Sequence, residues 1–206
     1  MPLESFHNAA TAAKGTLNDA FLASVIGGVR KYHERHDVAL DRLRVTLSIS
    51  LRTPEDPLGG NRITLQRFEL AANELDVKAR MRAVHAACRR ARDEPAVQHT
   101  DAIAATLNLL PTRVIGSMLK HVDVVASNVP GFTFRVYLAG AEVLAQYAFG
   151  PTIGAALNVT LLSYQNTCHL GISIDTNAAP DPEVLVECLR EGFDEVFEAT
   201  RTSTSS

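Results

Sequence analysis

The chain has 206 residues, of which 46% are hydrophobic and 21% charged, with a formal net charge of -3 and a pI near 6.2. This length suits one compact domain, or at most two small ones, and the composition is that of an ordinary globular protein. The weak negative charge excludes the bulk attraction to nucleic acid that a basic chain has.

Cysteine usage and apolar runs bear on where the protein works. Cys88, Cys168 and Cys188 are odd in number and widely spaced, which favours reduced core thiols in a cytosolic protein over a disulfide framework or a zinc site. The longest apolar run, around 21–29, is far shorter than the roughly 20 residues of a membrane-spanning helix. The amino terminus lacks the basic region and apolar core of a signal peptide. We therefore expect a cytoplasmic protein whose contact with a membrane, if it makes one, is peripheral.

Two helices are predicted at the start of the chain. The first covers 4–13 and ends at the Lys14-Gly15 step, since glycine readily takes the left-handed conformation after a helix. The run Thr16-Leu17-Asn18-Asp19 then offers several capping oxygens. The helix that follows has an apolar face at helical spacing, formed by Phe21, Leu22, Val25, Ile26 and Val29.

A strand, a loop, a second strand and two helices should follow. Strict alternation of apolar and polar residues over 43–51 predicts a half-buried strand. The next elements are expected to be a loop over 54–60, a strand over 61–70, a helix over 73–93 and a helix over 101–119 broken at Pro111. The helix over 73–93 should bury Leu75, Met81, Val84 and Cys88.

Strands dominate the second half of the chain. They are expected at about 122–126, 134–138, 142–147, 156–163 and 168–174. A last helix starts at Pro182 with Asp181 as its cap. Its buried stripe should contain Val184, Leu185, Cys188, Leu189, Phe193, Val196 and Phe197. The pattern predicts an α/β sandwich, a mixed sheet with helices packed on it, as one folded unit over 1–199 with a disordered tail over 200–206.

Six short motifs, in this order along the chain, carry a family resemblance. They are Thr16 to Asp19, the strand end Leu47 to Arg52, Gly60-Asn61, the turn Ser127-Asn128-Val129-Pro130-Gly131, the run Tyr137 to Ala141, and Ser163-Tyr164. The chain thereby resembles the carboxy-terminal half of the bacterial wax ester synthase/diacylglycerol acyltransferase family, within the wider group of CoA-dependent acyltransferases. The turn at 127–131 is the most specific match, and it departs from the family at Phe132, where a second proline is common.

The resemblance implies a two-lobe enzyme with a substrate tunnel between the lobes. The first lobe of the family carries the catalytic His-His-x-x-x-Asp-Gly motif, and no such motif occurs in this sequence. The resemblance therefore implies a second lobe that partners an amino-terminal lobe encoded separately. The resemblance implies no cofactor, because acyl-CoA is a substrate of the reaction. The implied acceptor is diacylglycerol or a long-chain alcohol. Contact with a membrane or lipid droplet would be peripheral.

Site candidates follow from the same resemblance. Two groups of them have both a structural and a functional interpretation. Ser127, Asn128, Pro130 and Gly131 either end a strand and turn the chain, or place donors near the acyl carbonyl. Asn18 and Asp19 are first a helix cap and second a tunnel-facing pair. Ser163 and Tyr164 complete the candidate set.

The other polar clusters are best explained as structural or solvent-exposed groups without a role in catalysis. None of His7, His33, His36, His85, His99 and His121 stands in the family's catalytic arrangement, and His169 is expected to be an outward strand residue. The run 33–36 resembles a metal motif but lacks the His-Glu-x-x-His spacing. Arg80, Arg82, Arg89, Arg90 and Arg92 are best explained as a solvated helix face, with contact to CoA phosphates or anionic lipid as the weaker alternative.

Three functions remain open at the level of sequence. The first is the second lobe of an acyl-CoA-dependent O-acyltransferase that is inactive without its catalytic lobe. The second is a non-catalytic lipid-binding or interaction module that kept the fold. The third is an inactive relic of a split gene.

Overall fold

The computed structural model describes residues 1–50, 63–92, 122–152 and 154–201. The expected loop over 54–60 and helix over 101–119 lie outside these residues. The helices are α1 (Leu3–Ala12), α2 (Leu17–Arg35), α3 (Val77–Arg92) and α6 (Pro182–Arg201). The strands are β1 (Arg42–Ser50), β2 (Ile63–Ala71), β3 (Val124–Pro130), β4 (Tyr137–Leu138), β5 (Ala141–Glu142), β6 (Leu157–Tyr164) and β7 (Thr167–Ile174).

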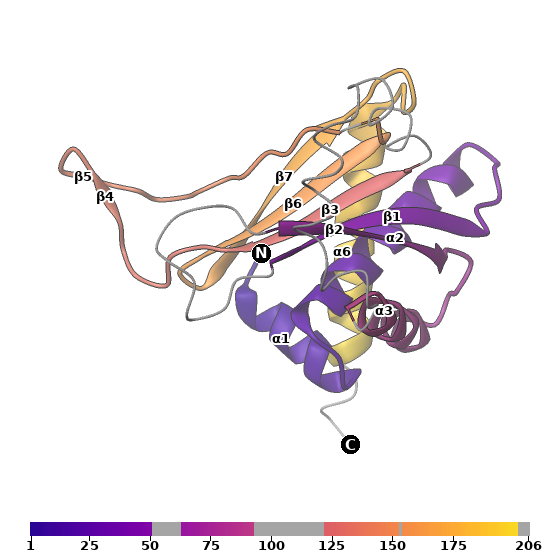
Figure 1. Ribbon diagram of the computed structural model, residues 1–206, viewed down its shortest axis with the longest axis horizontal. Coiled ribbons are helices and arrows are strands. Elements are labelled where there is room, and N and C mark those ends of the chain that lie inside the picture. The colour runs from indigo at the N-terminus through magenta and orange to yellow at the C-terminus, as the bar shows by residue number, and fades with distance from the viewer. Residues whose placement is uncertain (51–62, 93–121, 153, 202–206) are drawn as a thin grey trace, which may run out of the picture.

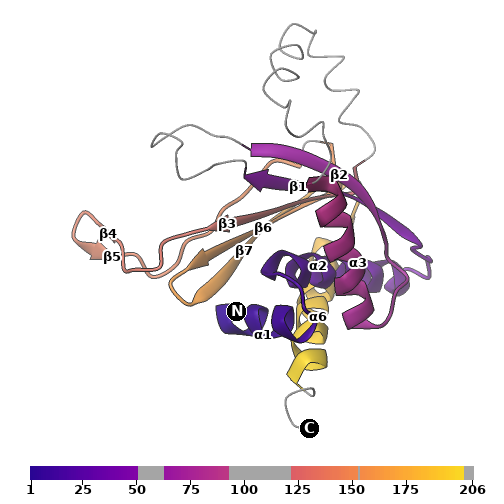
Figure 2. The same cartoon turned by 60° about the horizontal axis from the view of Figure 1, so that its bottom comes forward.

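The main sheet is mixed, as predicted. Its order is β2-β1-β3-β6-β7, with β1, β3 and β6 parallel to one another and β2 and β7 antiparallel at the two edges. The four helices lie on one face of this sheet (Figures 1 and 2). The architecture is therefore an α/β lobe in which three parallel strands deliver their carboxyl ends to the same edge.

The core lies between the sheet and the helices. Alternate residues of β1 and β6, such as Leu43, Leu47 and Leu161, face α2 and α6. Helices α2 and α6 approach closely where both carry glycine: a Cβ on Gly192 would lie 2.3 Å from the carbonyl oxygen of Ser24, and one on Gly28 would lie 2.6 Å from the Cα of Leu189. These glycines let the two helix backbones pack nearly in contact over the sheet.

The junction between α1 and α2 follows the predicted capping with one difference. Lys14, and not Gly15, takes the left-handed conformation, with φ of 55°. Gly15 has no room for a side chain, because a Cβ would lie 2.8 Å from Asp19 Oδ2. Thr16 and Asp19 form a full capping box at the start of α2. Gly15 is therefore required for its close contact with Asp19, while Lys14 adopts the left-handed conformation that ends α1.

Helix α3 differs from expectation in two places. It begins at Val77, because the Asp76 side chain accepts hydrogen bonds from the backbone N–H groups of Lys78 and Ala79. Leu75 therefore precedes the helix and is 66% exposed, where burial was expected. Arg80 is 1% exposed and ion-paired with Glu195 of α6, so it does not belong to the solvated face on which Arg82, Arg89 and Arg90 lie. Met81, Val84 and Cys88 are buried as predicted.

The segment between β3 and β6 forms an arm that reaches away from the body of the lobe (Figure 1). The strands expected over 134–138 and 142–147 shrink to the two-residue pair β4 and β5, which pair only with each other. The limb that returns from β5 lies against β7, where a Cβ on Gly171 would come within 1.8 Å of the carbonyl oxygen of Ala148. Its exposed large apolar side chains are Phe132, Phe134, Tyr137, Leu138, Leu144, Tyr147 and Phe149.

Helix α6 starts at Pro182 and runs to Arg201, two residues past the expected boundary at 199. Cys88, Cys168 and Cys188 are buried, as predicted, and none of the three takes part in a disulfide. Within the described ranges, no helix combines the length and apolar character needed to cross a bilayer.

Candidate functional site

Ser127 and Asn128 lie near the carboxyl end of β3, where the parallel strands β1 and β6 flank them. Successive residues of a strand face opposite sides of the sheet, so these two side chains diverge. Ser127 shares the face away from the helices with its strand neighbours Ser48 and Thr160. Asn128 shares the face of Val124 and Ala126, which pack in the core against the helices. This end of β3, which the sequence suggested to be a turn, is still strand and presents a hydroxyl on one face of the sheet and an amide on the other.

Asn128 is joined to Asn18 across the helix–sheet interface. Its Nδ2 donates to Asn18 Oδ1 over 2.8 Å, and both residues are half-buried. Asn18 lies in the first turn of α2, and Asn128 near the end of β3. Two of the motifs that carried the family resemblance, 110 residues apart in sequence, are thus in direct contact.

Asp19 is 1% exposed and fully engaged. Its Oδ2 accepts from the backbone N of Thr16 at 2.6 Å and from the Thr16 hydroxyl at 2.9 Å. His85 of α3 adds a third contact, with Nδ1 2.8 Å from Asp19 Oδ2; the imidazole donates here because a carboxylate only accepts. Asp19 is therefore a helix cap, as first expected, that also fixes the ring of His85.

Gly131 and Ser163 hold the exit of β3 against β6. The backbone N of Gly131 donates to Ser163 Oγ at 3.3 Å. A Cβ at Gly131 would lie 2.0 Å from the Ser163 carbonyl oxygen, so only glycine fits at this point. Pro130 precedes it on the surface and ends β3. Their arrangement directs the chain out of the sheet and into the arm.

Tyr164 anchors the arm to the sheet. Its ring is buried, and its hydroxyl accepts from the backbone N of Val136 at 3.0 Å and donates to the carbonyl oxygen of Val143 at 2.8 Å. Both limbs of the arm are held by this one side chain. Of the other candidates, Ser163 and Asn18 contact the motif at 127–131 directly. Tyr164 instead bonds the arm, and Asp19 bonds Thr16 and His85.

The other histidines in the described part of the chain lie apart from one another or at a helix end, and His99 and His121 lie outside the described residues. Among the residues that the structure describes, no group of three His, Cys, Asp or Glu side chains is placed to hold a metal ion. His33 and His36 lie at the end of α2, as expected for a helix terminus. His169 faces away from the helices, its ring 4.9 Å from that of Tyr147. Burial lowers the pKa of His169, with a smaller effect from the N-terminal ammonium.

Sequence reasoning missed two polar pairs. His85 and Asp19 are 66 residues apart, and Arg44 and Asp123 are 79 apart. Arg44 donates to the Asp123 carboxylate from its backbone N at 2.8 Å, from Nε at 3.1 Å and from Nη2 at 2.6 Å. Asp19 belongs to the motif at 16–19, but its partner His85 and both members of the second pair belong to none. Their only signal in the sequence is a charged or titratable residue next to a strand or on a helix face.

Solved structures with the same architecture define the class of fold. The chain superposes with a TM-score of 0.69 on the wax ester synthase/diacylglycerol acyltransferase from Marinobacter aquaeolei VT8, at 22% identity, covering 97% of this chain and 47% of that one. It matches the condensation domain of the enacyloxin polyketide synthase with a TM-score of 0.62, at 15% identity, covering 96% of this chain and 39% of that one. The fold is that of one lobe of a CoA-dependent acyltransferase.

Sequence comparisons give the family within this class. The family model of the WS/DGAT C-terminal domain matches residues 59–196, so the chain belongs to the wax ester synthase/diacylglycerol acyltransferase family as its C-terminal domain. A putative diacylglycerol O-acyltransferase of Mycobacterium tuberculosis is 38% identical over 198 residues, covering 95% of this chain and 40% of that protein. A probable diacylglycerol O-acyltransferase of the same species, Tgs4, is 29% identical over 217 residues, covering 100% of this chain and 46% of that protein. The chain thus spans less than half the length of these relatives.

Proposed function

We propose that this chain is the second lobe of an acyl-CoA-dependent O-acyltransferase that makes triacylglycerol or wax esters. The observation that carries the proposal is the match to the C-terminal domain of this family over 59–196, together with coverage of 40–46% of the curated relatives. The substrates would be a fatty acyl-CoA and either diacylglycerol or a long-chain alcohol. A first lobe carrying the His-His-x-x-x-Asp-Gly motif would supply the rest of the enzyme.

The reaction divides between the lobes by chemical role. The alcohol oxygen attacks the thioester carbonyl carbon, a base takes the hydroxyl proton, and the carbon–sulfur bond breaks as that proton passes to the leaving thiolate. Histidine of the first lobe would be this base, because its pKa lies near neutrality. The second lobe would form one wall of the tunnel and contribute polar groups near the carbonyl.

Asn128 and Ser127 are the residues proposed to act from this lobe. Asn128 is fixed by Asn18, which holds one amide hydrogen and leaves the other free to donate. Ser127 offers a hydroxyl on the opposite face, in a row with Ser48 and Thr160. Because the two side chains diverge, only one of them can serve a given carbonyl. A substitution at each residue therefore reports which face of the sheet lines the tunnel.

The arm would contact the first lobe. It carries seven exposed large apolar side chains between Phe132 and Phe149, a density typical of an interaction surface. Tyr164 bonds both limbs of the arm, at Val136 and Val143, so the base of the arm is fixed by contacts within this lobe. The first lobe is the proposed occupant, because the relatives extend well beyond the part that this chain matches.

Reconstitution tests this function. The chain would be co-expressed with the amino-terminal half of a 38%-identical mycobacterial relative, and ester formation from acyl-CoA would be followed with diacylglycerol and with hexadecan-1-ol. We expect turnover from the pair and none from either part alone. A stable complex without turnover would favour the interaction module, and the absence of any complex would contradict the two-lobe proposal.

A further inference from the structure

A cavity lies at the opposite end of the sheet from Ser127 and Gly131. It has a volume of about 330 Å³ and opens where β1, β3 and β6 begin, between the sheet and helices α2 and α6. Asp123, on its wall, precedes β3 directly, so the five-residue rise to Asn128 separates the two regions by roughly 15 Å. The cavity is therefore distinct from the candidate acyl-transfer site.

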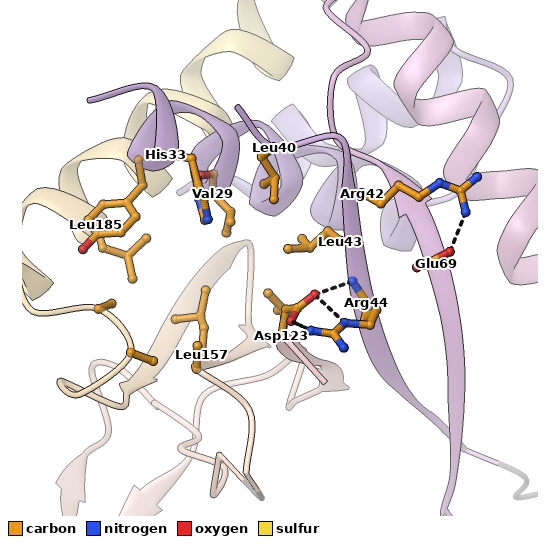
Figure 3. Close-up of a pocket in the computed structure, with 15 residues that line it drawn as sticks. Val29, His33, Leu40, Arg42, Leu43, Arg44, Glu69, Asp123, Leu157 and Leu185 are labelled. Atoms are coloured by element: carbon orange, nitrogen blue, oxygen red, sulfur yellow. Dashed lines mark hydrogen bonds and ion pairs between the residues drawn. The ribbon is translucent and has the colours of Figure 1, made fainter. Parts of the chain in front are cut away.

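The floor of the cavity is aliphatic. It is formed by Val29, Leu40, Leu43, Val124, Leu157 and Leu185. Five of these residues belong to the buried core, and Leu40 packs against it. Figure 3 shows the leucine side chains around an open centre, with His33 pointing into the cavity from the helix side and Asp123 lying on the sheet side. Aliphatic walls with a few convergent polar groups are typical of small-molecule sites.

The rim carries paired charges of both signs. Arg44 binds Asp123 through three hydrogen bonds, and Arg42 pairs with Glu69. Burial alone would raise the pKa of Asp123, but the hydrogen bonds and charge of Arg44, with a smaller effect from His33 when its ring is protonated, lower it below the ordinary value. Asp123 is thus an ionised carboxylate already satisfied by Arg44. An anionic head group would meet Asp123 and Glu69, and a cationic one would meet Arg42 and Arg44.

The buried hydroxyl of Tyr32, on the cavity wall, has no hydrogen-bond partner. His33 also has bonding capacity left. Its Nδ1 lies 3.0 Å from the carbonyl oxygen of Val29, which can only accept, so Nδ1 carries the proton. In the neutral ring Nε2 is then an acceptor. A ligand that donates one hydrogen bond and carries no charge matches this arrangement. We propose that the cavity binds a single aliphatic chain with a hydroxyl head group, the chain lying on the leucine floor and the hydroxyl donating to His33 Nε2.

Titration of the 206-residue chain with octan-1-ol, octanoate and octylamine tests both parts of the proposal. Methyl NMR spectra would report binding through the leucine and valine side chains of the floor. We expect saturable binding of octan-1-ol, with shifts at Leu43, Leu157 and Leu185, and affinities at least about threefold weaker for the two charged probes. Equal or tighter binding of octanoate or octylamine would overturn the head-group assignment.

Three variants locate the site. His33→Leu removes the acceptor and should weaken octan-1-ol binding by about three- to tenfold, the worth of one ordinary hydrogen bond. Ala178→Trp, at an exposed position on the cavity wall, should block binding while leaving the fold intact. His7→Leu, on the surface of α1 far from the cavity, is the matched control and should bind as the wild type does. Octan-1-ol binding that persists in both cavity variants, or that is lost in Asn128→Ala, would overturn the proposal.

The proposal stands apart from the acyltransferase function, because the titration needs neither acyl-CoA nor a first lobe. Failure of reconstitution with normal octan-1-ol binding would reject the enzyme and keep the cavity. Turnover by the reconstituted pair without octan-1-ol binding in the cavity would support the acyltransferase function and reject the cavity proposal.

Discussion

The side-chain amide of Asn128 donates to the side-chain oxygen of Asn18 over 2.8 Å, joining the end of β3 to the first turn of α2. The bond places two separate sequence motifs at one point of the helix–sheet interface. It also makes the position of Asn128 dependent on a helix that begins with a capping box. Stability and the presentation of a donor are therefore coupled at this site.

Double-mutant analysis should detect that coupling. Asn18→Ala and Asn128→Ala are each expected to lower the free energy of unfolding by about 1–3 kcal/mol, because each leaves a half-buried partner without its bond. The double variant should lose less than the sum, by about 0.5–1.5 kcal/mol. Urea denaturation of the four proteins measures this, and additivity would show that the bond contributes nothing.

Turnover of the reconstituted enzyme should separate Ser127 from Asn128. Removal of a donor to the developing oxyanion costs about 100- to 1000-fold in turnover. We expect this loss, per folded molecule, for the one residue whose face lines the tunnel, and near-wild-type turnover for the other. Unfolding midpoints of the same variants are the control. Unchanged turnover in both Ser127→Ala and Asn128→Ala would reject the functional interpretation of this turn.

The buried guanidinium of Arg80 should be costly to remove. Nη2 donates to Glu195 at 3.1 Å and Nη1 to the carbonyl oxygen of Glu74 at 3.1 Å, joining α3 to α6. Arg80→Ala leaves the Glu74 carbonyl oxygen without its donor and opens a cavity, while Glu195 keeps its ion pairs with Arg30 and Lys31. A loss of about 2–4 kcal/mol is therefore expected. Arg82→Ala, on the exposed side of the same helix, should stay within about 0.5 kcal/mol of the wild type. Similar values for the two variants would place Arg80 on the solvated face after all.

A glycine-to-alanine change in α6 should reverse its usual sign. In an exposed helix this change stabilises by about 1 kcal/mol. At Gly192 the new Cβ would lie 2.3 Å from the Ser24 carbonyl oxygen and 2.5 Å from the Gly28 nitrogen, so α2 and α6 must separate. We expect Gly192→Ala to lower the thermal midpoint, whereas Glu198→Ala, at an exposed position of the same helix, should leave it nearly unchanged. A higher midpoint for Gly192→Ala would show that the helices tolerate the separation.

Asp123 should make stability depend on pH in the acid range. Its pKa is lowered in the folded state, so its contribution is complete above the unfolded pKa of about 3.9 and is lost as the pH falls through the folded value. The stability difference between wild type and Asp123→Asn should therefore be largest near neutral pH and shrink below about pH 4. Urea unfolding across this range measures it, and a difference independent of pH would be inconsistent with an ionised, Arg44-bound carboxylate.

Self-association should follow from the exposed arm. Leu138 and Leu144 are 75% and 83% exposed, and the isolated chain offers them only water or another copy. Sedimentation velocity is expected to show oligomers or aggregates that diminish in the Leu138→Ser, Leu144→Ser double variant. A monomeric wild-type chain at high concentration would argue that the arm is not built to be covered.

Local chemistry in the sequence was sufficient for several elements. Strict alternation marked the strand at 43–51, and Thr16 with Asp19 marked the start of α2, because period-two burial and capping depend on neighbouring residues alone. The order of short motifs also indicated the family, since each motif is a local pattern. The motif at 127–131 was visible for the same reason, but its predicted turn was placed too early: 127–130 continue β3 beside β6, and the chain leaves the sheet only after Pro130.

Contacts between distant residues were decided only by the tertiary structure. Periodicity shows which face of α3 is apolar, but not that Arg80 meets Glu195 or that His85 meets Asp19, because those pairs depend on how α2, α3 and α6 are placed on the sheet. The sequence also did not determine the length of β4 and β5, because a strand extends only as far as a neighbouring strand pairs with it, and that pairing depends on the tertiary structure. The same holds for the cavity beside His33: its walls come from α2, β1, β3, β6 and α6, and only their packing brings an aliphatic floor and a hydrogen-bond acceptor to one place.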